Sequence, residues 1–229
     1  MPAGGGRGSV RALIVSRGRG FIFVHIPKTG GTAMALALEA RAMAGDILIG
    51  DTPKARRRRR RLAGLRPAGR LWKHSRLAAT EGTVTREELA RLFTFTLVRN
   101  PWDRTVSYYH WLRVQRFDHP AVALAKRLDF APFLIHPHTR ASLGRESYAG
   151  YMTDGAGVEP ARAWLRVEHL DQDIAPLAEH PGFRPELPAG VNASARIRDW
   201  RGYYSDETAA LIARLRGDDI ARIGYRFDP

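Results

Sequence analysis

The sequence predicts a three-layer α/β domain whose central sheet is mainly parallel. Short apolar runs typical of buried strands recur along the chain, helix-forming segments separate them, and no internal repeat is visible. Strands that alternate with helices are typical of a parallel sheet with helices on its faces. The 229 residues, 44% of them hydrophobic, can bury a sizeable core, and we expect one domain spanning residues 1–229.

The first strand and helix follow residues 1–18, which we expect to be a flexible lead. Residues 21–25 (FIFVH) form a short apolar run bounded by glycine and proline, as expected for a buried strand. Residues 32–44 are rich in Ala, Leu, Met and Glu, which predicts a helix closed by Gly45.

A basic segment comes next, and we expect residues 50–70 to be an irregular insertion. It contains the arginine run 56–61, which supplies six of the formal net charges of +14. The chain would still carry +8 without it, so a polyanionic partner is one interpretation of the composition. Like charges in a block repel one another, and no aromatic residues that could stack on bases are interleaved. We therefore interpret the run as a solvated, mobile loop and expect no nucleic-acid partner.

A second strand lies between two predicted helices. Residues 85–91 begin with Thr-Arg-Glu-Glu, a capping-box pattern that predicts a short helix. Residues 92–98 (LFTFTLV) are β-branched and aromatic, which predicts a second buried strand. The Asn-Pro pair at 100–101 then starts a helix that runs to about residue 113.

The remaining chain predicts short elements. Residues 118–157 hold several Pro, His and Gly residues and indicate short helices and loops. Residues 163–167 (AWLRV) predict a third strand. A helix is expected from residue 205 to 216, because Ser-Asp-Glu places a cap and acidic residues at its positive end.

The junction of the first strand and helix has the composition of a phosphate-binding turn. A helix start leaves backbone N–H groups without partners, and glycines allow a close approach to phosphate oxygens. Lys28 adds a mobile charge beside Gly30 and Gly31, while Thr29 and Thr32 add hydroxyl groups. The lysine precedes the glycines, so the segment is not a Walker A loop. A purely structural turn is the alternative.

A second candidate segment follows the strand at residues 92–98. Arg99 comes directly after this strand, at the edge where open α/β sheets bind ligands. Ser107 lies eight residues further on, about two turns into the predicted helix. An arginine suits a bidentate phosphate contact. The alternative is that Arg99 pairs with a carboxylate and Ser107 is an ordinary helix residue.

Together, HIPKTGGT and LVRNPWDRTVSYY resemble the cofactor signatures of sulfotransferases. The likeness is greatest to the sulfotransferase group 2 family, which includes heparan sulfate 2-O-sulfotransferase-like enzymes and bacterial members. The resemblance implies a P-loop-like fold that binds the sulfuryl donor PAPS (3′-phosphoadenosine 5′-phosphosulfate). It assigns the 5′-phosphate side to residues 28–32 (Lys28, Thr29, Gly30, Gly31 and Thr32), and the 3′-phosphate to Arg99 and Ser107. It also assigns Asn192 and Ser194 to a loop that closes over the nucleotide.

The same resemblance suggests how the site would catalyse transfer to a hydroxyl. Lys28 is the candidate for stabilising the leaving phosphate, and His74 is the candidate general base, because histidine serves this role near neutral pH. Glu168 is the acidic alternative to His74. His25 precedes the first loop, and we expect it to pack against the loop or orient it.

These signatures lead to predictions about partners. We expect PAPS as donor, no metal ion, and an acceptor hydroxyl on a carbohydrate or glycolipid, with an anionic glycan among the candidates. The chain has no cysteine and no apolar run long enough to span a bilayer, so we expect a cytoplasmic, bacterial-type protein. A P-loop-like nucleotide kinase or phosphotransferase and a non-enzymatic polyanion-binding module are the alternatives.

Overall fold

The structure is a computed structural model that describes residues 12–69, 71, 75–188 and 199–227. The chain divides into two compact units, which we describe separately. The first contains residues 1–98 and 151–192, and the second contains residues 99–150 and 193–229. The expectation of a single domain stays a prediction. Within the described ranges, no helix is long and apolar enough to cross a membrane.

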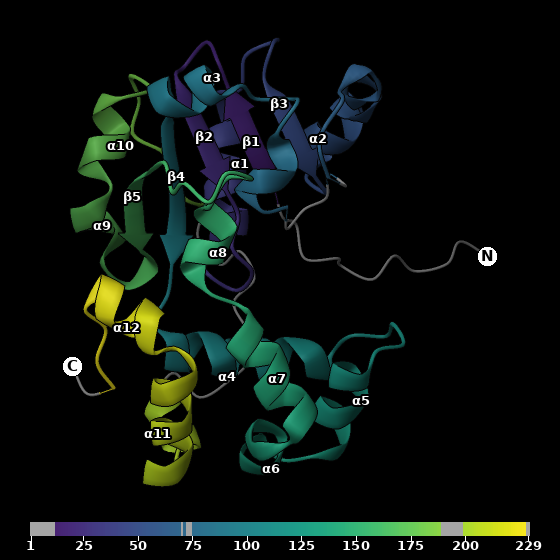
Figure 1. The fold of residues 1–229 in the computed structure, drawn as a ribbon, viewed down its shortest axis with the longest axis vertical. Helices are drawn as coiled ribbons and strands as arrows, with labels where there is room; N and C mark the ends of the chain where they lie inside the picture. The colour runs from purple at the N-terminus through teal and green to yellow at the C-terminus, as the bar shows by residue number, and fades with distance from the viewer. Residues whose placement is uncertain (1–11, 70, 72–74, 189–198, 228–229) are drawn as a thin grey trace. The chain divides into compact units, whose positions relative to one another are not determined.

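The first unit is built on a five-stranded sheet with the strand order β3-β1-β2-β4-β5 (Figure 1). Its strands are β1 (Ala12–Ser16), β2 (Phe21–Val24), β3 (Ile47–Gly50), β4 (Phe93–Val98) and β5 (Ala161–Arg166). β2 pairs in parallel with β4, and β4 with β5, whereas β1 is antiparallel to both β2 and β3. Four of the five strands therefore run in one direction, which confirms the predicted α/β class with a mainly parallel sheet.

The prediction that residues 1–18 form a flexible lead is wrong for the described part of that segment. β1 lies inside the sheet, hydrogen-bonded to β2 on one side and to β3 on the other. A turn in which the N–H of Gly20 donates to the carbonyl of Arg17 connects β1 to β2. The sequence signals this strand weakly, because its five residues stand between arginines and glycines and because its pairing with β3 is distant in sequence.

Both faces of this sheet are buried. On one face, Phe23, Phe95 and Leu165 belong to a core with Met34 of α1 (Gly31–Ala40) and Leu177 of α10 (Ala175–Glu179). The opposite face is also closed to solvent at Leu13, Val15, Ile22 and Val24. Strands that are apolar on both faces are typical of a sheet inside an α/β sandwich.

Helix α1 is shorter than the predicted helix at residues 32–44. The carboxylate of Asp46 accepts hydrogen bonds from the N–H of Met43 and the hydroxyl of Ser16, each at 2.7 Å. These contacts hold residues 43–46 in a turn that leads into β3, so the helix ends at Ala40 and the chain can return to the sheet.

The prediction of an irregular insertion at residues 50–70 is also wrong. Residues 53–64 form α2 (Pro53–Arg58) and the 3₁₀ helix η1 (Arg59–Gly64). The hydroxyl of Thr52 caps α2 by accepting the N–H of Ala55 at 3.0 Å. Arg58 and Arg61 each donate a 2.7 Å hydrogen bond to a carbonyl of the preceding loop. Hydrogen bonds to the carbonyls of Met43 and Ala44, which are distant in sequence from the arginine run, thus offset the repulsion between its charges.

Short helices complete the first unit. The capping box of Thr85 and Glu88 is present at the start of α3, as predicted. The other described helices are η2 (Leu77–Thr80), α3 (Arg86–Arg91), η3 (Val167–His169) and α9 (Leu170–Asp173). In Figure 1, α2 lies beside β3, and α9 and α10 lie beside β5.

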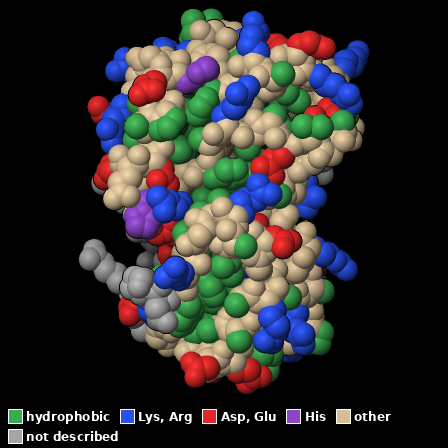
Figure 2. Space-filling model, turned by 60° about the vertical axis from the view of Figure 1, so that its left-hand side comes forward, with side chains coloured by type: hydrophobic (Ala, Val, Ile, Leu, Met, Phe, Trp, Pro, Cys, Tyr) green, Lys and Arg blue, Asp and Glu red, His purple; other side chains and the backbone are tan. Residues whose placement is uncertain are grey.

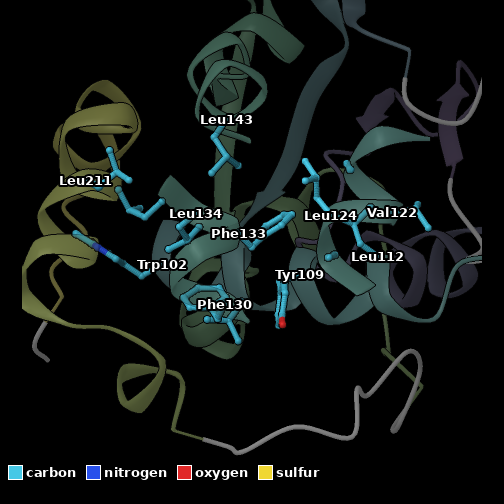
Figure 3. Close-up of a cluster of buried hydrophobic side chains, with 14 residues drawn as sticks. Trp102, Tyr109, Leu112, Val122, Leu124, Phe130, Phe133, Leu134, Leu143 and Leu211 are labelled. Atoms are coloured by element: carbon cyan, nitrogen blue, oxygen red, sulfur yellow. The ribbon is translucent and has the colours of Figure 1, made fainter. Parts of the chain in front are cut away.

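The second unit is helical. Its helices pack around Trp102, Tyr109, Phe130, Phe133 and Leu211 (Figure 3). They are α4 (Pro101–Arg113), α5 (Pro120–Arg127), α6 (Phe130–Ile135), α7 (Pro137–Arg145), η4 (Trp200–Tyr203), α11 (Asp206–Leu215) and α12 (Gly217–Ile223). A further helix, α8 (Tyr148–Met152), spans the boundary of the two units. The predicted starts of α4 and α11 and the short helices of residues 118–157 are confirmed.

Candidate active site

The loop between β2 and α1 alternates the sign of its backbone φ angles. Lys28 has φ +69° and Gly30 has φ +82°, whereas Pro27 and Thr29 have negative φ. Lys28 is the only non-glycine residue with positive φ in the part of the chain that the structure describes. Such alternation between right- and left-handed conformations is found in the backbone concavities that bind anions.

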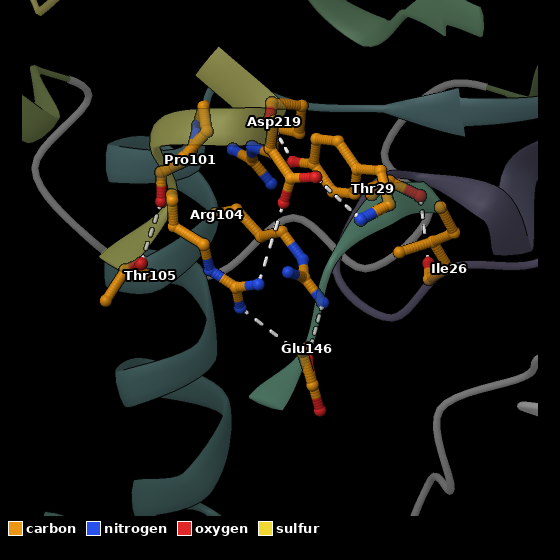
Figure 4. A network of polar contacts seen from close by, with 10 residues as sticks. Ile26, Thr29, Pro101, Arg104, Thr105, Glu146 and Asp219 are labelled. Atoms are coloured by element: carbon orange, nitrogen blue, oxygen red, sulfur yellow. Dashed lines mark hydrogen bonds and ion pairs between the residues drawn. The ribbon is translucent and has the colours of Figure 1, made fainter. Parts of the chain in front are cut away.

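The left-handed conformation of Lys28 costs conformational energy, of order 1–3 kcal/mol for a residue with a side chain. The loop is held by Thr29, which is buried and donates its hydroxyl proton to the carbonyl of Ile26 at 2.9 Å (Figure 4). In this state the Thr29 hydroxyl shapes the loop, and its backbone N–H remains the group that it can offer to an anion.

Helix α1 begins directly after this loop without a side-chain cap. Its N-cap residue is Gly30, and the first turn contains no acidic residue. A Cβ atom on Gly31 would lie 2.3 Å from Cδ2 of His25, so only glycine allows the buried imidazole to pack there. His25 also stacks on Phe23 of β2, and its proximity to Gly31 agrees with the prediction that it packs beside the loop. The positive end of α1 is therefore not neutralised by a carboxylate of its own first turn.

The register of the sheet brings the end of β4 beside this loop. Val24 pairs with Thr96, whose hydroxyl donates to the Val24 carbonyl at 2.7 Å. The carboxyl ends of β2 and β4 therefore meet at one edge of the sheet, and Arg99 follows the last residue of β4 by one peptide bond.

In the second unit, Arg99 pairs with a carboxylate, the alternative considered from the sequence. Its Nε and Nη2 atoms each lie 2.7 Å from Oδ2 of Asp103. Asn100 caps α4 by accepting the N–H of Trp102 at 3.1 Å. The Arg99 guanidinium is thus fixed along the first turn of α4, and it retains further N–H groups beyond these two.

Ser107 lies on the same stripe of α4 as Asp103. The two residues are four positions apart, so their side chains are neighbours on the helix surface. Ser107 is buried, with 5% of its surface exposed. Its hydroxyl is consequently one helical turn beyond the carboxylate that holds Arg99.

A buried polar network in the second unit fixes the backbone of Arg99. Tyr148 donates its hydroxyl hydrogen bond to the Arg99 carbonyl, and its backbone N–H donates to Asp219 at 2.7 Å. Arg104 donates to Glu146 at 3.0 Å and lies 5.4 Å from the Tyr148 ring centroid (Figure 4). No sequence pattern pointed to Tyr148, which is 49 residues from Arg99.

Burial shifts three pKa values in this network, each in the direction that disfavours the charged form. It raises the pKa of Tyr148 to about 12, so the phenol remains a hydrogen-bond donor at neutral pH. It also raises the pKa of the Asp219 carboxyl and lowers the pKa of Arg216. The guanidinium Nη1 of Arg216 and Oδ2 of Asp219 are 3.6 Å apart, and neither atom has a hydrogen-bond partner in the structure.

Three predicted site residues, His74, Asn192 and Ser194, lie outside the described residues. Glu168, the alternative base, lies in η3 immediately after β5. Since β5 is parallel to β4, Glu168 is at the same edge of the sheet as the Lys28 loop. Its neighbour Val167 limits the loop, because a Cβ on Gly30 would lie 3.1 Å from Val167 Cγ2. No cluster of three potential metal-ligating side chains occurs among the described residues.

Comparison with known proteins gives a family and a structural likeness. A model described as "Sulfotransferase family" matches residues 11–133, more than half of the chain. No curated protein matches the sequence. Among solved structures, the chain is similar to the crystal structure of mouse sulfotransferase SULT7A1 complexed with PAP. That match has 15% sequence identity and a TM-score of 0.46, and covers 90% of this chain and 86% of the other.

Proposed function

Because the chain belongs to the sulfotransferase family, we propose that it transfers the sulfuryl group of PAPS to a hydroxyl of a carbohydrate or glycolipid. The observation that carries the donor part is the loop at residues 27–30, with its alternating φ signs before the uncapped start of α1. A backbone of this shape beside a lysine suits a phosphate group.

The proposal divides the donor between two segments. Lys28 and the N–H groups of residues 28–32 hold the 5′-phosphate side, including Gly30, Gly31 and Thr32. Arg99 and Ser107 hold the 3′-phosphate, with Asp103 keeping the guanidinium in position. Asn192 and Ser194 close over the nucleotide.

The chemistry requires three actions from the chain. Bound PAPS supplies a sulfuryl group on a phosphate leaving group, and the attacking and leaving oxygens should lie roughly in line. Lys28 stabilises the negative charge that develops on the leaving phosphate. His74 takes the proton of the acceptor hydroxyl, and Glu168 is the alternative, supported by its place at the same sheet edge as the loop.

The ordered arginine run supports an anionic glycan as acceptor. Arg56, Arg57, Arg59 and Arg60 are exposed, and none of them forms an ion pair among the described residues. Thr52, Arg58 and Arg61 hold the helical segment that presents them. Repeated acidic groups along a glycan could pair with these side chains. On the face drawn in Figure 2, basic and acidic side chains are interspersed.

The donor is tested by thermal shift with adenosine 3′,5′-bisphosphate (PAP). We expect PAP to raise the melting temperature without Mg²⁺, and Lys28→Ala to reduce the effect. A requirement for Mg-ATP would instead favour the kinase alternative.

The acceptor is tested with labelled PAPS and a panel of glycans, glycolipids and phenols. We expect label to enter sulfated or carboxylated glycans or glycolipids, and His74→Ala to abolish this transfer while PAP still binds. Transfer only to phenols would overturn the acceptor part of the proposal. A bacterial origin and a cytoplasmic location are further parts of the proposal, supported by composition alone.

A further inference from the structure

A pocket lies at the opposite edge of the sheet from the Lys28 loop. It has a volume of about 610 Å³, and its lining includes Arg17, Arg19, Met43, Arg91, Glu179 and His180. These residues surround the turn between β1 and β2 and the amino ends of β2 and β4. The volume is in the range of small-molecule sites.

Glycines bring the walls of this pocket close together. Gly20 has φ +70°, and its carbonyl accepts a hydrogen bond from Nε2 of His180 at 2.6 Å. A Cβ on Gly20 would lie 2.9 Å from that nitrogen, and a Cβ on Gly18 would lie 2.6 Å from Sδ of Met43. The His180 ring also stacks on Phe93 with centroids 5.0 Å apart. The wall formed by His180 is therefore held at two points.

The three arginines of the pocket differ in how far their charge is offset. Arg17 forms a 2.6 Å ion pair with Glu88. Arg19 instead donates to two backbone carbonyls, those of Arg41 at 3.0 Å and Pro181 at 3.3 Å. Across the described ranges, neither Arg19 nor Arg91 forms an ion pair.

The orientation of Arg19 is set before any ligand arrives. Its guanidinium lies 4.9 Å from the ring centroid of Phe183, and the two carbonyl contacts fix its plane. Arg17 is fixed in the same way, by Glu88 and by the carbonyl of Thr83 at 2.7 Å. Preorganised guanidinium groups lose little side-chain entropy when they bind an oxyanion. Glu179 is the only acidic residue of the lining. An anion in the pocket would therefore be attracted by Arg19 and Arg91, the two lining arginines that form no ion pair among the described residues.

We propose that this pocket binds the phosphate or sulfate ester group of a small molecule, separately from the PAPS site. Arg19 and Arg91 supply the positive charge, and the apolar lining at Met43 and Leu92 accommodates the rest of the ligand. The four residues of β2 stand between Gly20 and the start of the Lys28 loop, a rise of about 3.3 Å per residue. A ligand of ordinary size therefore occupies one site without filling the other.

The proposal is tested on the full chain with the nucleotide site saturated by PAP. Sodium sulfate or sodium phosphate is titrated against sodium chloride of equal ionic strength, and binding is followed by thermal shift and calorimetry. We expect saturable binding of sulfate and phosphate, weakened about tenfold or more in Arg91→Gln. Arg86→Gln is the matched control, because Arg86 is exposed on the same helix and does not line the pocket.

Further arms identify the source of the ester. Glucose 6-sulfate and adenosine 5′-phosphate are compared with glucose and adenosine, and tighter binding of one ester than of its free ion assigns the ligand class. Arg19→Gln is a second variant and should weaken the same ligands. Equal binding by wild type and Arg91→Gln, or no effect beyond that of chloride, would overturn the proposal. If PAP itself does not bind, the titration is repeated in Lys28→Ala, which removes the charge of the Lys28 loop, and sulfate binding that is lost in this variant but kept in Arg91→Gln would overturn the proposal.

Discussion

The conformation of Lys28 links stability and activity at a single residue. Because its φ is +69°, replacing it with glycine removes a strained side chain as well as the proposed catalytic charge. We expect Lys28→Gly to raise the free energy of unfolding by about 1 kcal/mol and to lower kcat about 100-fold or more. Denaturant unfolding and single-turnover transfer from PAPS measure the two effects.

The control for this prediction is Lys28→Ala, which removes the same charge but keeps a side chain at positive φ. It should lose activity to the same extent without gaining stability. A Lys28→Gly variant with near wild-type turnover would contradict the role of Lys28 on the leaving phosphate.

Tyr148 is a positioning residue for Arg99. Removing its hydroxyl frees the Arg99 carbonyl, and we expect Tyr148→Phe to weaken PAP binding severalfold, as for a lost hydrogen bond of about 1 kcal/mol. Calorimetric titration with PAP measures this change.

Tyr109→Phe is a matched control for Tyr148→Phe. Tyr109 also donates to a backbone carbonyl, that of Leu128 at 2.9 Å, but near the other end of α4. It should cost similar stability and leave PAP affinity unchanged. Equal losses of affinity in the two variants would indicate a general effect on packing.

At the scale of elements, Glu39 joins α1 to the segment that contains α2. Its carboxylate accepts the Thr52 hydroxyl at 2.6 Å, and burial raises the pKa of Glu39 above its ordinary value of 4.5. The folded state therefore holds this proton more tightly than the unfolded state, and the associated stability is lost as pH rises through the folded pKa.

Glu39→Gln should remove this pH dependence while keeping an acceptor for Thr52. We expect the stability of the variant, relative to wild type, to increase as the pH rises above 4.5, the ordinary value for glutamate. Urea unfolding at several pH values tests this, and a difference that does not change with pH would contradict it.

The elements that the sequence predicts well are those with local signals. β2 and β4 are apolar runs, and α3 and α4 begin with capping residues that the structure confirms. β1 and β3 are similarly short, but β1 stands among glycines and arginines, and the pairing of β1 with β3 joins segments that are distant in the sequence. The repulsion between the charges of the arginine run predicts a mobile loop. Hydrogen bonds from Arg58 and Arg61 to the backbone carbonyls of residues 43 and 44 instead hold the run in a helical conformation.

The same distinction applies to the candidate site. The Lys28 loop and Arg99 could be found because each sits at a strand end. The Arg99–Asp103 ion pair could also be predicted from the sequence, because the two residues are four positions apart at the start of a helix. Tyr148 could not be found, because only the folding of α7 and α8 brings it to the Arg99 carbonyl.

At the scale of the whole molecule, the effect of the arginine run on acceptor binding can be distinguished from the effect of the overall net charge. Replacing Arg56, Arg57, Arg59 and Arg60 with glutamine lowers the net charge of +14 by four. If these arginines hold an anionic acceptor, the variant should have a higher KM for that acceptor and a weaker dependence of kcat/KM on salt. Its KM for PAPS should not change.

The matched control removes four charges from exposed arginines elsewhere, Arg86, Arg116, Arg140 and Arg145. This variant should keep the acceptor KM and the salt dependence of the wild type. Identical behaviour of the two variants would assign the effect to overall charge, and the run would then have no specific role in acceptor binding.

The interior place of β1 has a practical consequence for shortened chains. A fragment starting at Gly18 would leave the facing borders of β2 and β3 with unmatched amide and carbonyl groups, a template for aggregation. A shortened chain intended for crystallisation should therefore retain residues 12–16, although the surrounding glycines and arginines resemble a dispensable terminal segment.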